Sequence, residues 1–128
     1  MTPDEHALLT TQWRHSVGAG WWDVVEETHQ KLLALDPGYQ IDQIKEKFGG
    51  LRYYFSPSQF DDGLVDEAMN KVVAEAEKKC SKLCEACGKP GRIRGSDSGF
   101  SWWQTVCDEC AEETLKRMTA YNKEWEEE

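Results

Sequence analysis

The 128-residue chain lacks the features that would assign it to a membrane or secreted class. It has no run of about 18 apolar residues, so we expect no transmembrane helix. The N-terminal residues MTPDEHALLTTQW contain no basic segment before an apolar stretch, so we expect no secretory signal. The protein is therefore expected to stay in a reducing cytoplasm. There, cysteine pairs bind metal more often than they form disulfides.

The chain also lacks the excess of positive charge that nucleic-acid-binding proteins usually carry. The formal net charge is −9, from 15 basic and 24 acidic residues. Residues 1–79 and 111–128 are acidic, whereas residues 80–110 carry four groups of each sign. Because binding to phosphates usually leaves a basic footprint on the protein, this pattern disfavours nucleic acid as the partner.

Catalytic patterns are missing as well. No His-x-Glu is present, and neither cysteine pair follows a proline, so the zinc deaminase signature is absent. His6, His15 and His29 all precede the cysteines, whereas nucleases of the His-Asn-His type need histidines on the finger. No nucleophile is paired with a base, and we expect no enzyme activity. The competing hypothesis is a nuclease or hydrolase that uses Asp61 and Asp62 with a second metal. These two aspartates would otherwise cap a helix beginning near Leu64.

What the chain does contain is enough apolar and aromatic material for one modest core. Apolar residues make up 39%, and six of the fourteen aromatic residues are tryptophan. Apolar spacing and stop signals predict helices over about 2–16, 21–35, 64–82 and 111–125. Two alternating runs joined by Gly49-Gly50 predict a β-hairpin over residues 40–55. We predict an α+β protein in which a helix and hairpin region, 1–79, packs as one unit with a cysteine module, 80–128.

Alternation along the predicted hairpin separates two faces. Phe48 falls on the apolar face. The opposite face carries the residues Lys45, Lys47, Arg52 and Tyr54. The simplest interpretation of this second face is a solvated sheet surface, and the alternative is a binding surface for a partner.

Four of the five cysteines form two C-x2-C pairs, separated by the nineteen residues between Cys87 and Cys107. This spacing predicts a Zn²⁺ site on Cys84, Cys87, Cys107 and Cys110, because two such pairs supply four thiolates for a tetrahedral ion. The alternative is a set of buried structural or redox thiols. Cys80 is predicted to be a packed core thiol rather than an alternative ligand.

The order of elements around the cysteines refines this prediction. A C-x2-C knuckle, a strand at 92–94, a Gly/Ser-rich turn, a strand at 100–106 and a second pair opening a helix resemble the treble-clef zinc finger. A catalytic zinc keeps one coordination position open for water or substrate. Four cysteines close the shell, so we interpret the metal as structural.

The predicted finger also carries Arg92, Arg94, Trp102 and Trp103. Strand alternation places one tryptophan of the pair in the core and the other at the surface. Arginine beside an exposed aromatic side chain is typical of protein-protein contacts. The same residues could grip phosphates and stack bases, or could serve the fold alone.

Several blocks resemble a family of small, mostly uncharacterised proteins of bacteriophages and prophages. They are GWWDVVEETHQKLLAL, QIKEKFGGLRYYF, CEACGKPGRIR and WWQTVCDEC, spread over roughly residues 20–110. The turn RGSDSGFSWW is longer than in the plainer pattern of that family. The resemblance implies a phage setting in a bacterial cytoplasm and a zinc module, and it implies no activity. With the acidic charge, it leads us to expect a protein-binding module that blocks a host factor, such as a CRISPR, restriction or nuclease complex or the transcription machinery. The alternative is a nucleic-acid-binding zinc finger.

Overall fold

The computed structural model describes residues 16–58, 63–95 and 102–126. The predicted helix at 2–16, the Asp61-Asp62 pair and most of the turn between the two short strands lie outside these residues. The described elements, in chain order, are a 3-10 turn η2 (Ala19–Trp21), α2 (Trp22–Leu35), β1 (Gln40–Lys47), β2 (Gly50–Ser56), α3 (Leu64–Cys80), β3 (Arg92–Arg94), β4 (Gln104–Val106) and α4 (Asp108–Glu126). The predicted α+β class is confirmed, with three described α-helices and two antiparallel hairpins.

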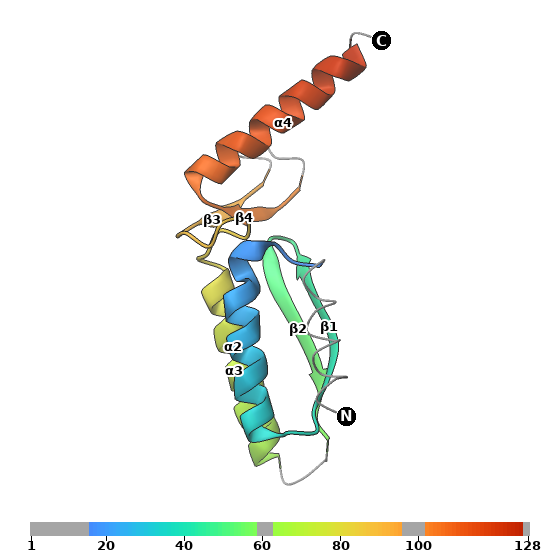
Figure 1. The fold of residues 1–128 in the computed structure, drawn as a ribbon, viewed down its shortest axis with the longest axis vertical. Helices are drawn as coiled ribbons and strands as arrows, with labels where there is room; N and C mark the ends of the chain where they lie inside the picture. Colours follow the sequence, from blue (N-terminus) through green and yellow to red (C-terminus); the bar gives the residue numbers. More distant parts are fainter. Residues whose placement is uncertain (1–15, 59–62, 96–101, 127–128) are drawn as a thin grey trace.

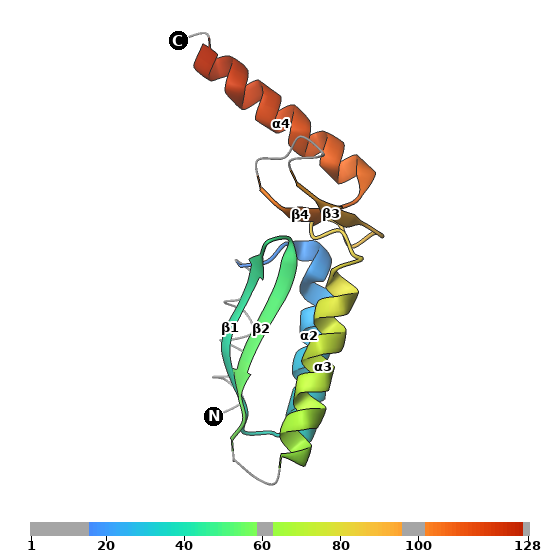
Figure 2. The same cartoon turned by 180° about the vertical axis from the view of Figure 1, so that it is seen from behind.

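The two helices α2 and α3 lie side by side and cover one face of the β1–β2 hairpin (Figures 1 and 2). Their predicted positions are confirmed to within two residues at each end. Each helix turns an apolar stripe towards the hairpin, and the buried side chains form one core. This core consists of Val17, Trp21, Val24, Val25, Leu32, Tyr39, Ile44, Leu51, Tyr53, Met69, Val73, Ala76 and Cys80. We call this part of the molecule, residues 16–80, the body.

The end of α2 is held by the carboxylate of Asp36. The backbone N–H of Gly38 donates to this carboxylate at 3.2 Å, and that of Ser58 at 2.8 Å; the Ser58 hydroxyl donates as well. Burial of Asp36 disfavours its charged form. The hydrogen bonds from Ser58 and Gly38 outweigh burial, so the pKa of Asp36 is lowered. Asp36, which directly follows α2, therefore also links the end of this helix to the segment after β2.

The β1–β2 hairpin turns one residue earlier than predicted. Its two-residue turn is Phe48-Gly49, with φ angles of 54° and 81°, and Gly50 already belongs to β2. Two positive φ angles are typical of a type I′ turn, which matches the twist of the flanking strands. The placement of Phe48 on the apolar face is therefore wrong: the turn directs its side chain outward, and it is 66% exposed. The predicted shared face is confirmed, because Lys45 pairs with Arg52 and the Lys45 ammonium lies 5.8 Å from the Tyr54 ring centroid.

A chain of polar groups crosses the core of the body. The Tyr39 hydroxyl is hydrogen-bonded to both the Tyr53 hydroxyl, at 2.7 Å, and His29 Nδ1. All three side chains are buried. Burial is the main cause that raises the pKa of both tyrosines, so both stay neutral at physiological pH. The network satisfies polar groups that would otherwise be costly to bury.

The short β3–β4 hairpin and α4 form the second part of the molecule. We call residues 83–95 with 102–126 the finger. Figures 1 and 2 show that the finger caps one end of the body and that α4 extends away from it. Strand β4 is shorter than the predicted 100–106, beginning only at Gln104. Among the described residues, no helix is both long and apolar enough to cross a membrane.

Candidate metal centre

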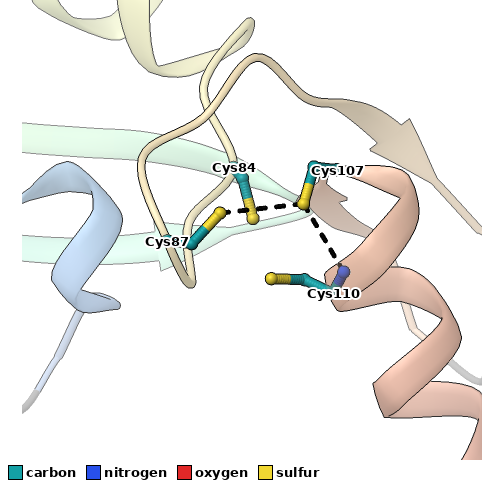
Figure 3. Close-up of side chains that lie close together, drawn as sticks. All are labelled: Cys84, Cys87, Cys107 and Cys110. Atoms are coloured by element: carbon teal, nitrogen blue, oxygen red, sulfur yellow. Dashed lines mark hydrogen bonds between the residues drawn. The ribbon is translucent and has the colours of Figure 1, made fainter.

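The four predicted ligands come together in the finger. The sulfur atoms of Cys84, Cys87, Cys107 and Cys110 all lie within 4.8 Å of one another (Figure 3). The sulfurs of Cys87 and Cys107 are 3.7 Å apart. A tetrahedral ion with metal-sulfur bonds of about 2.3 Å would separate its sulfur ligands by about 3.8 Å. The cluster therefore has the size that a metal ion needs.

The first pair lies on a tight knuckle between α3 and β3. The N–H of Gly88 donates to the carbonyl oxygen of Cys84 at 2.9 Å, and the N–H of Cys84 donates to that of Lys89 at 2.7 Å. Gly88 has a φ of 81°, a conformation that costs glycine little and other residues more. Glycine at this position therefore serves the tight turn of the knuckle.

The second pair lies at the start of α4. Cys107 directly precedes the helix, and the N–H of Cys110 points at the Cys107 sulfur at 3.4 Å (Figure 3). Free N–H groups and the positive end of the helix dipole favour thiolate charge at this position. The start of the helix thus holds Cys110 and lies next to Cys107, and it favours the thiolate charge of both.

The pKa values of the Cys84 and Cys110 thiols are shifted in opposite directions. Burial disfavours the thiolate of Cys84, but backbone hydrogen bonds from Cys107, Cys87 and Ala86 outweigh it and lower its pKa to about 7. The pKa of Cys110 is raised by burial and by the thiols around it. Four thiolates this close repel one another, and a bound cation removes that conflict. The four cysteines are thus placed where a metal ion could bind them all.

Cys80 lies outside this cluster. Its side chain is buried among the apolar residues of the body. Burial and the nearby carboxylates of Glu85 and Glu77 raise the pKa of its thiol to about 12. The structure thus places Cys80 where the sequence predicted it, as a packed core thiol.

The knuckle docks on the start of α2 through close backbone contacts. The N–H of Gly20 donates to the carbonyl oxygen of Glu85 at 2.7 Å, and Trp21 Nε1 donates to that of Leu83 at 2.9 Å. A Cβ atom on Gly20 would lie 2.1 Å from the carbonyl oxygen of Cys84. The Gly18-Ala19-Gly20 spacing was the available signal for a close approach of two backbone segments.

The carboxylate of Glu85 lies at the contact between the knuckle and the start of α2. It is 9% exposed and accepts a hydrogen bond from the N–H of Gly18 at 3.0 Å. Its pKa is raised, chiefly by burial. Nothing in the sequence singled out this residue, because its role depends on a segment 67 positions away.

The hairpin tip makes the second contact between the body and the finger. The Thr105 hydroxyl donates to the carbonyl oxygen of Gly49 at 2.6 Å. A Cβ atom on Gly49 would lie 3.1 Å from the Ile93 side chain. The glycine of the turn is therefore needed both for its positive φ and for the approach of β3.

Of the two predicted surface arginines, only Arg92 is exposed. Arg94 is 8% exposed; its guanidinium is paired with the Asp108 carboxylate and donates to the Val106 carbonyl oxygen. The placement of Arg94 on a partner surface is therefore not supported. The ion pair with Asp108 and the hydrogen bond to Val106 hold this side chain inward, where it links β3 to the start of α4.

The two tryptophans also differ from expectation. Trp102 and Trp103 are 50% and 47% exposed, and neither is in the core. Both precede β4, so strand alternation does not apply to them. The Trp103 ring packs on the backbone of Gly95, where an added Cβ atom would lie 2.6 Å from it. Both tryptophans present part of their rings to solvent.

Phe48, Ile93, Trp102 and Trp103 together form what we call the junction patch. They are four of the seven large exposed hydrophobic residues among the described parts of the chain. Phe48 lies in the hairpin tip, next to Gly49, which faces Ile93 of β3, and Trp102 and Trp103 directly precede β4. Of these four residues, the sequence analysis proposed only Trp102 and Trp103 for a partner surface. Phe48 was placed on the apolar face of the hairpin, and Ile93 was not singled out.

In comparisons with known proteins, no family model, no curated protein and no solved structure matched the chain.

Proposed function

We propose that the protein is a small, non-enzymatic interaction module whose finger is held together by one structural Zn²⁺. The observation that carries the metal is the closed shell of four cysteines within 4.8 Å. Four thiolates in a tetrahedron suit Zn²⁺ and leave no coordination position for a substrate. The ion would fix the knuckle to the start of α4, and through these the finger to the body.

The junction patch is the proposed protein-binding surface. Exposed aromatic side chains on a rigid support are typical of the residues that dominate binding energy in protein interfaces. The contacts of Gly20 and Gly49 with the finger would keep the patch in one shape. A preformed surface loses less entropy on binding than a flexible one.

The proposed partner is a bacterial host factor with a basic nucleic-acid channel, and the protein would act as an acidic inhibitor encoded by a phage. This proposal depends on the net charge of −9 and on the resemblance to small phage proteins. Opposite charges speed association, and an occupied channel excludes the nucleic acid. CRISPR, restriction, nuclease and transcription complexes all contain such channels.

The rival proposal is a nucleic-acid-binding finger that uses Arg92 and an exposed tryptophan. Burial of Arg94 removes one of its two candidate phosphate contacts. The acidic charge of the chain also opposes binding to phosphates. We therefore favour a protein partner.

The decisive experiment is affinity capture from a nuclease-treated bacterial lysate, combined with a gel shift on generic DNA and RNA. We expect a stoichiometric bacterial protein to be retained and no shift of either nucleic acid. Phe48→Ala or Trp102→Ala should weaken the binding of this protein at least tenfold, as expected for central aromatic residues.

Leu64→Ala is the matched control, because Leu64 is 67% exposed and lies outside the junction patch. It should leave binding unchanged. Salt-sensitive binding to DNA or RNA without any protein partner would establish the rival, and Arg92→Ala should then weaken that binding.

A further inference from the structure

The face of the β1–β2 hairpin that turns away from α2 and α3 is positively charged (Figures 1 and 2). Strand alternation places four residues on it, opposite the buried side chains of the hairpin: Lys45, Lys47, Arg52 and Tyr54. We call these four residues the cationic face. Lys47 and Tyr54 are exposed, and the other two are half-buried. Three positive charges on two short strands contrast with the net charge of −9 of the whole chain.

The positive charges of the cationic face lie close together and have little compensation. Lys45 is the cross-strand partner of Arg52, and like charges at such positions repel each other. In the part of the chain that the structure describes, no ion pair includes Lys45, Lys47 or Arg52. Burial raises the pKa of Glu77, and the charge of Arg52 opposes this effect, so Arg52 is partly balanced. A bound anion would relieve the repulsion between the two strands.

Aromatic rings restrict both lysine side chains. Lys45 Nζ lies 5.8 Å from the centroid of the Tyr54 ring, and Lys47 Nζ lies 5.6 Å from that of the Phe48 ring. The two rings are 44% and 66% exposed, so both ammonium groups lie beside accessible aromatic surface. Phe48 also belongs to the junction patch. The cationic face is therefore continuous with the proposed protein-binding surface.

The spacing of the two lysines matches that of an extended peptide. Lys45 and Lys47 are two residues apart on β1, which corresponds to about 7 Å along the strand. Alternate side chains of an extended peptide repeat at the same distance, so two of its carboxylates could face both ammonium groups. Arg52 lies across from Lys45, and its guanidinium has the planar donor geometry that suits a carboxylate.

The charge of the whole chain favours a short acidic peptide over a nucleic acid as the occupant of this face. A nucleic acid carries a long row of phosphates, and the acidic remainder of the chain repels those that extend beyond the cationic face. A peptide with two or three carboxylates interacts mainly with charges within a Debye length, about 8 Å at physiological ionic strength. At that range the cationic face supplies the attraction.

We propose that the cationic face binds a short, extended acidic segment of a protein partner. Carboxylates at alternate positions of this segment pair with Lys45 and Lys47, and one of them also accepts from Arg52. The segment lies along β1 and ends at the junction patch beside Phe48. This inference rests on the proposed function, because it specifies the chemistry of the partner next to the junction patch.

The test uses the full zinc-loaded chain, labelled with ¹⁵N, and follows backbone amide shifts by NMR during titration with blocked peptides. The acidic probe is Thr-Glu-Thr-Glu-Thr, and its control is Thr-Gln-Thr-Gln-Thr, which has nearly the same shape and no charge. The acidic peptide should shift the amides of Lys45, Lys47 and Arg52, with a dissociation constant on the order of millimolar. The glutamine peptide should bind at least about tenfold more weakly.

A thymidine hexanucleotide is the third probe, and it should bind more weakly than the acidic peptide. Tighter binding of the hexanucleotide to the same amides would overturn the proposal in favour of nucleic acid. Equal binding of the two peptides to the wild-type chain would overturn it as well, whether or not any variant folds.

Lys45→Gln should weaken binding of the acidic peptide about fivefold. The matched control is Lys71→Gln, which removes the same charge from an exposed position on α3 and should leave binding unchanged. Equal effects of the two substitutions would refute the proposal, because the overall charge of the chain would then explain the binding.

These titrations need no host protein, so they separate this proposal from the proposed function. Absence of peptide binding with retained capture of a host protein would refute the acidic segment and leave the proposed function standing. Peptide binding at the cationic face without capture of any host protein would support the face and refute the host factor.

Discussion

The body and the finger are stabilised by different means. The body buries thirteen residues around the hairpin and two helices, including Trp21, Leu32 and Met69 at 0% exposure. The finger's core has four buried residues, and two of them are cysteines. Burial of apolar area can therefore hold the body together, whereas the finger has too little of it. In the finger, a bound metal would therefore take the place of a hydrophobic core.

The largest expected effect comes from removing the metal, which tests this contrast directly. Cys107→Ser should abolish zinc binding and unfold the finger, because a structural zinc supplies roughly 10 kcal/mol of apparent folding free energy in small domains. Metal analysis should give one zinc per wild-type chain and none for the variant, and circular dichroism should show loss of α4. The core of the body should stay folded.

Cys80→Ser is the matched control for this substitution. It places a hydroxyl in the core of the body and should lower stability while leaving one zinc per chain. If the wild-type chain contained no metal and its finger were still folded, the finger would not depend on a metal as proposed.

The next largest effect is expected for Trp21, which packs in the core of the body and donates a hydrogen bond to the finger. Trp21→Ala removes a fully buried side chain and its hydrogen bond to Leu83. We expect a loss of about 4 kcal/mol in the free energy of unfolding, measured by urea denaturation. Trp21→Phe keeps most of the buried area and should cost less. Equal losses for the two variants would mean that the hydrogen bond to the finger, rather than packing in the body, carries the effect.

A smaller loss is expected when the backbone contact between body and finger is blocked. Gly20→Ala would place a Cβ atom 2.1 Å from the Cys84 carbonyl oxygen, and Gly50→Ala would meet its nearest atom at 3.4 Å. We expect Gly20→Ala to cost about 3 kcal/mol and to loosen the finger from the body. Gly50→Ala should cost under about 1 kcal/mol. Amide hydrogen exchange should show increased opening around Leu83 and Glu85 in the first variant only.

The smallest effect is a pH dependence that belongs to the body alone. Because the pKa of folded Asp36 is lowered, its contribution to stability is present above its unfolded pKa of about 3.9 and is lost as pH falls through the folded value. Asp36→Asn should cost about 1 to 2 kcal/mol at pH 7. Below about pH 4, the free energy of unfolding of the Asp36→Asn variant should fall less steeply with pH than that of the wild-type protein. Parallel curves for the two proteins would contradict this assignment.

Much of the secondary structure could be predicted from local patterns. The apolar stripes of α2 and α3 and the alternation in β1 and β2 repeat over enough residues to be unambiguous. The hairpin turn was harder, because Phe48-Gly49 and Gly49-Gly50 both supply glycine for a positive φ. Contacts of Gly49 with Thr105 and Ile93 hold the observed turn against the finger. These contacts are far away in the sequence, so no local pattern could reveal them.

The cysteine cluster was predictable for a related reason. Two C-x2-C pairs encode both the ligand type and the local geometry, and the structure needs only to bring the pairs together. The partner surface was predicted less well. The two tryptophans were placed by strand alternation, which does not apply to them because β4 begins only at Gln104. Arg94 is buried beside Asp108, a contact that no local pattern revealed.

The α+β class, the helices of the body and the four cysteines of the finger are each encoded by spacing within a short segment, so the amino-acid order was enough to predict them. Which side chains remain exposed depends instead on how these segments pack. Phe48 lies outside because the turn is held by Thr105, and Arg94 lies inside because Asp108 lies beside it. Burial and charge pairing depend on segments that meet only in the folded chain, so these features follow from packing rather than from any local pattern.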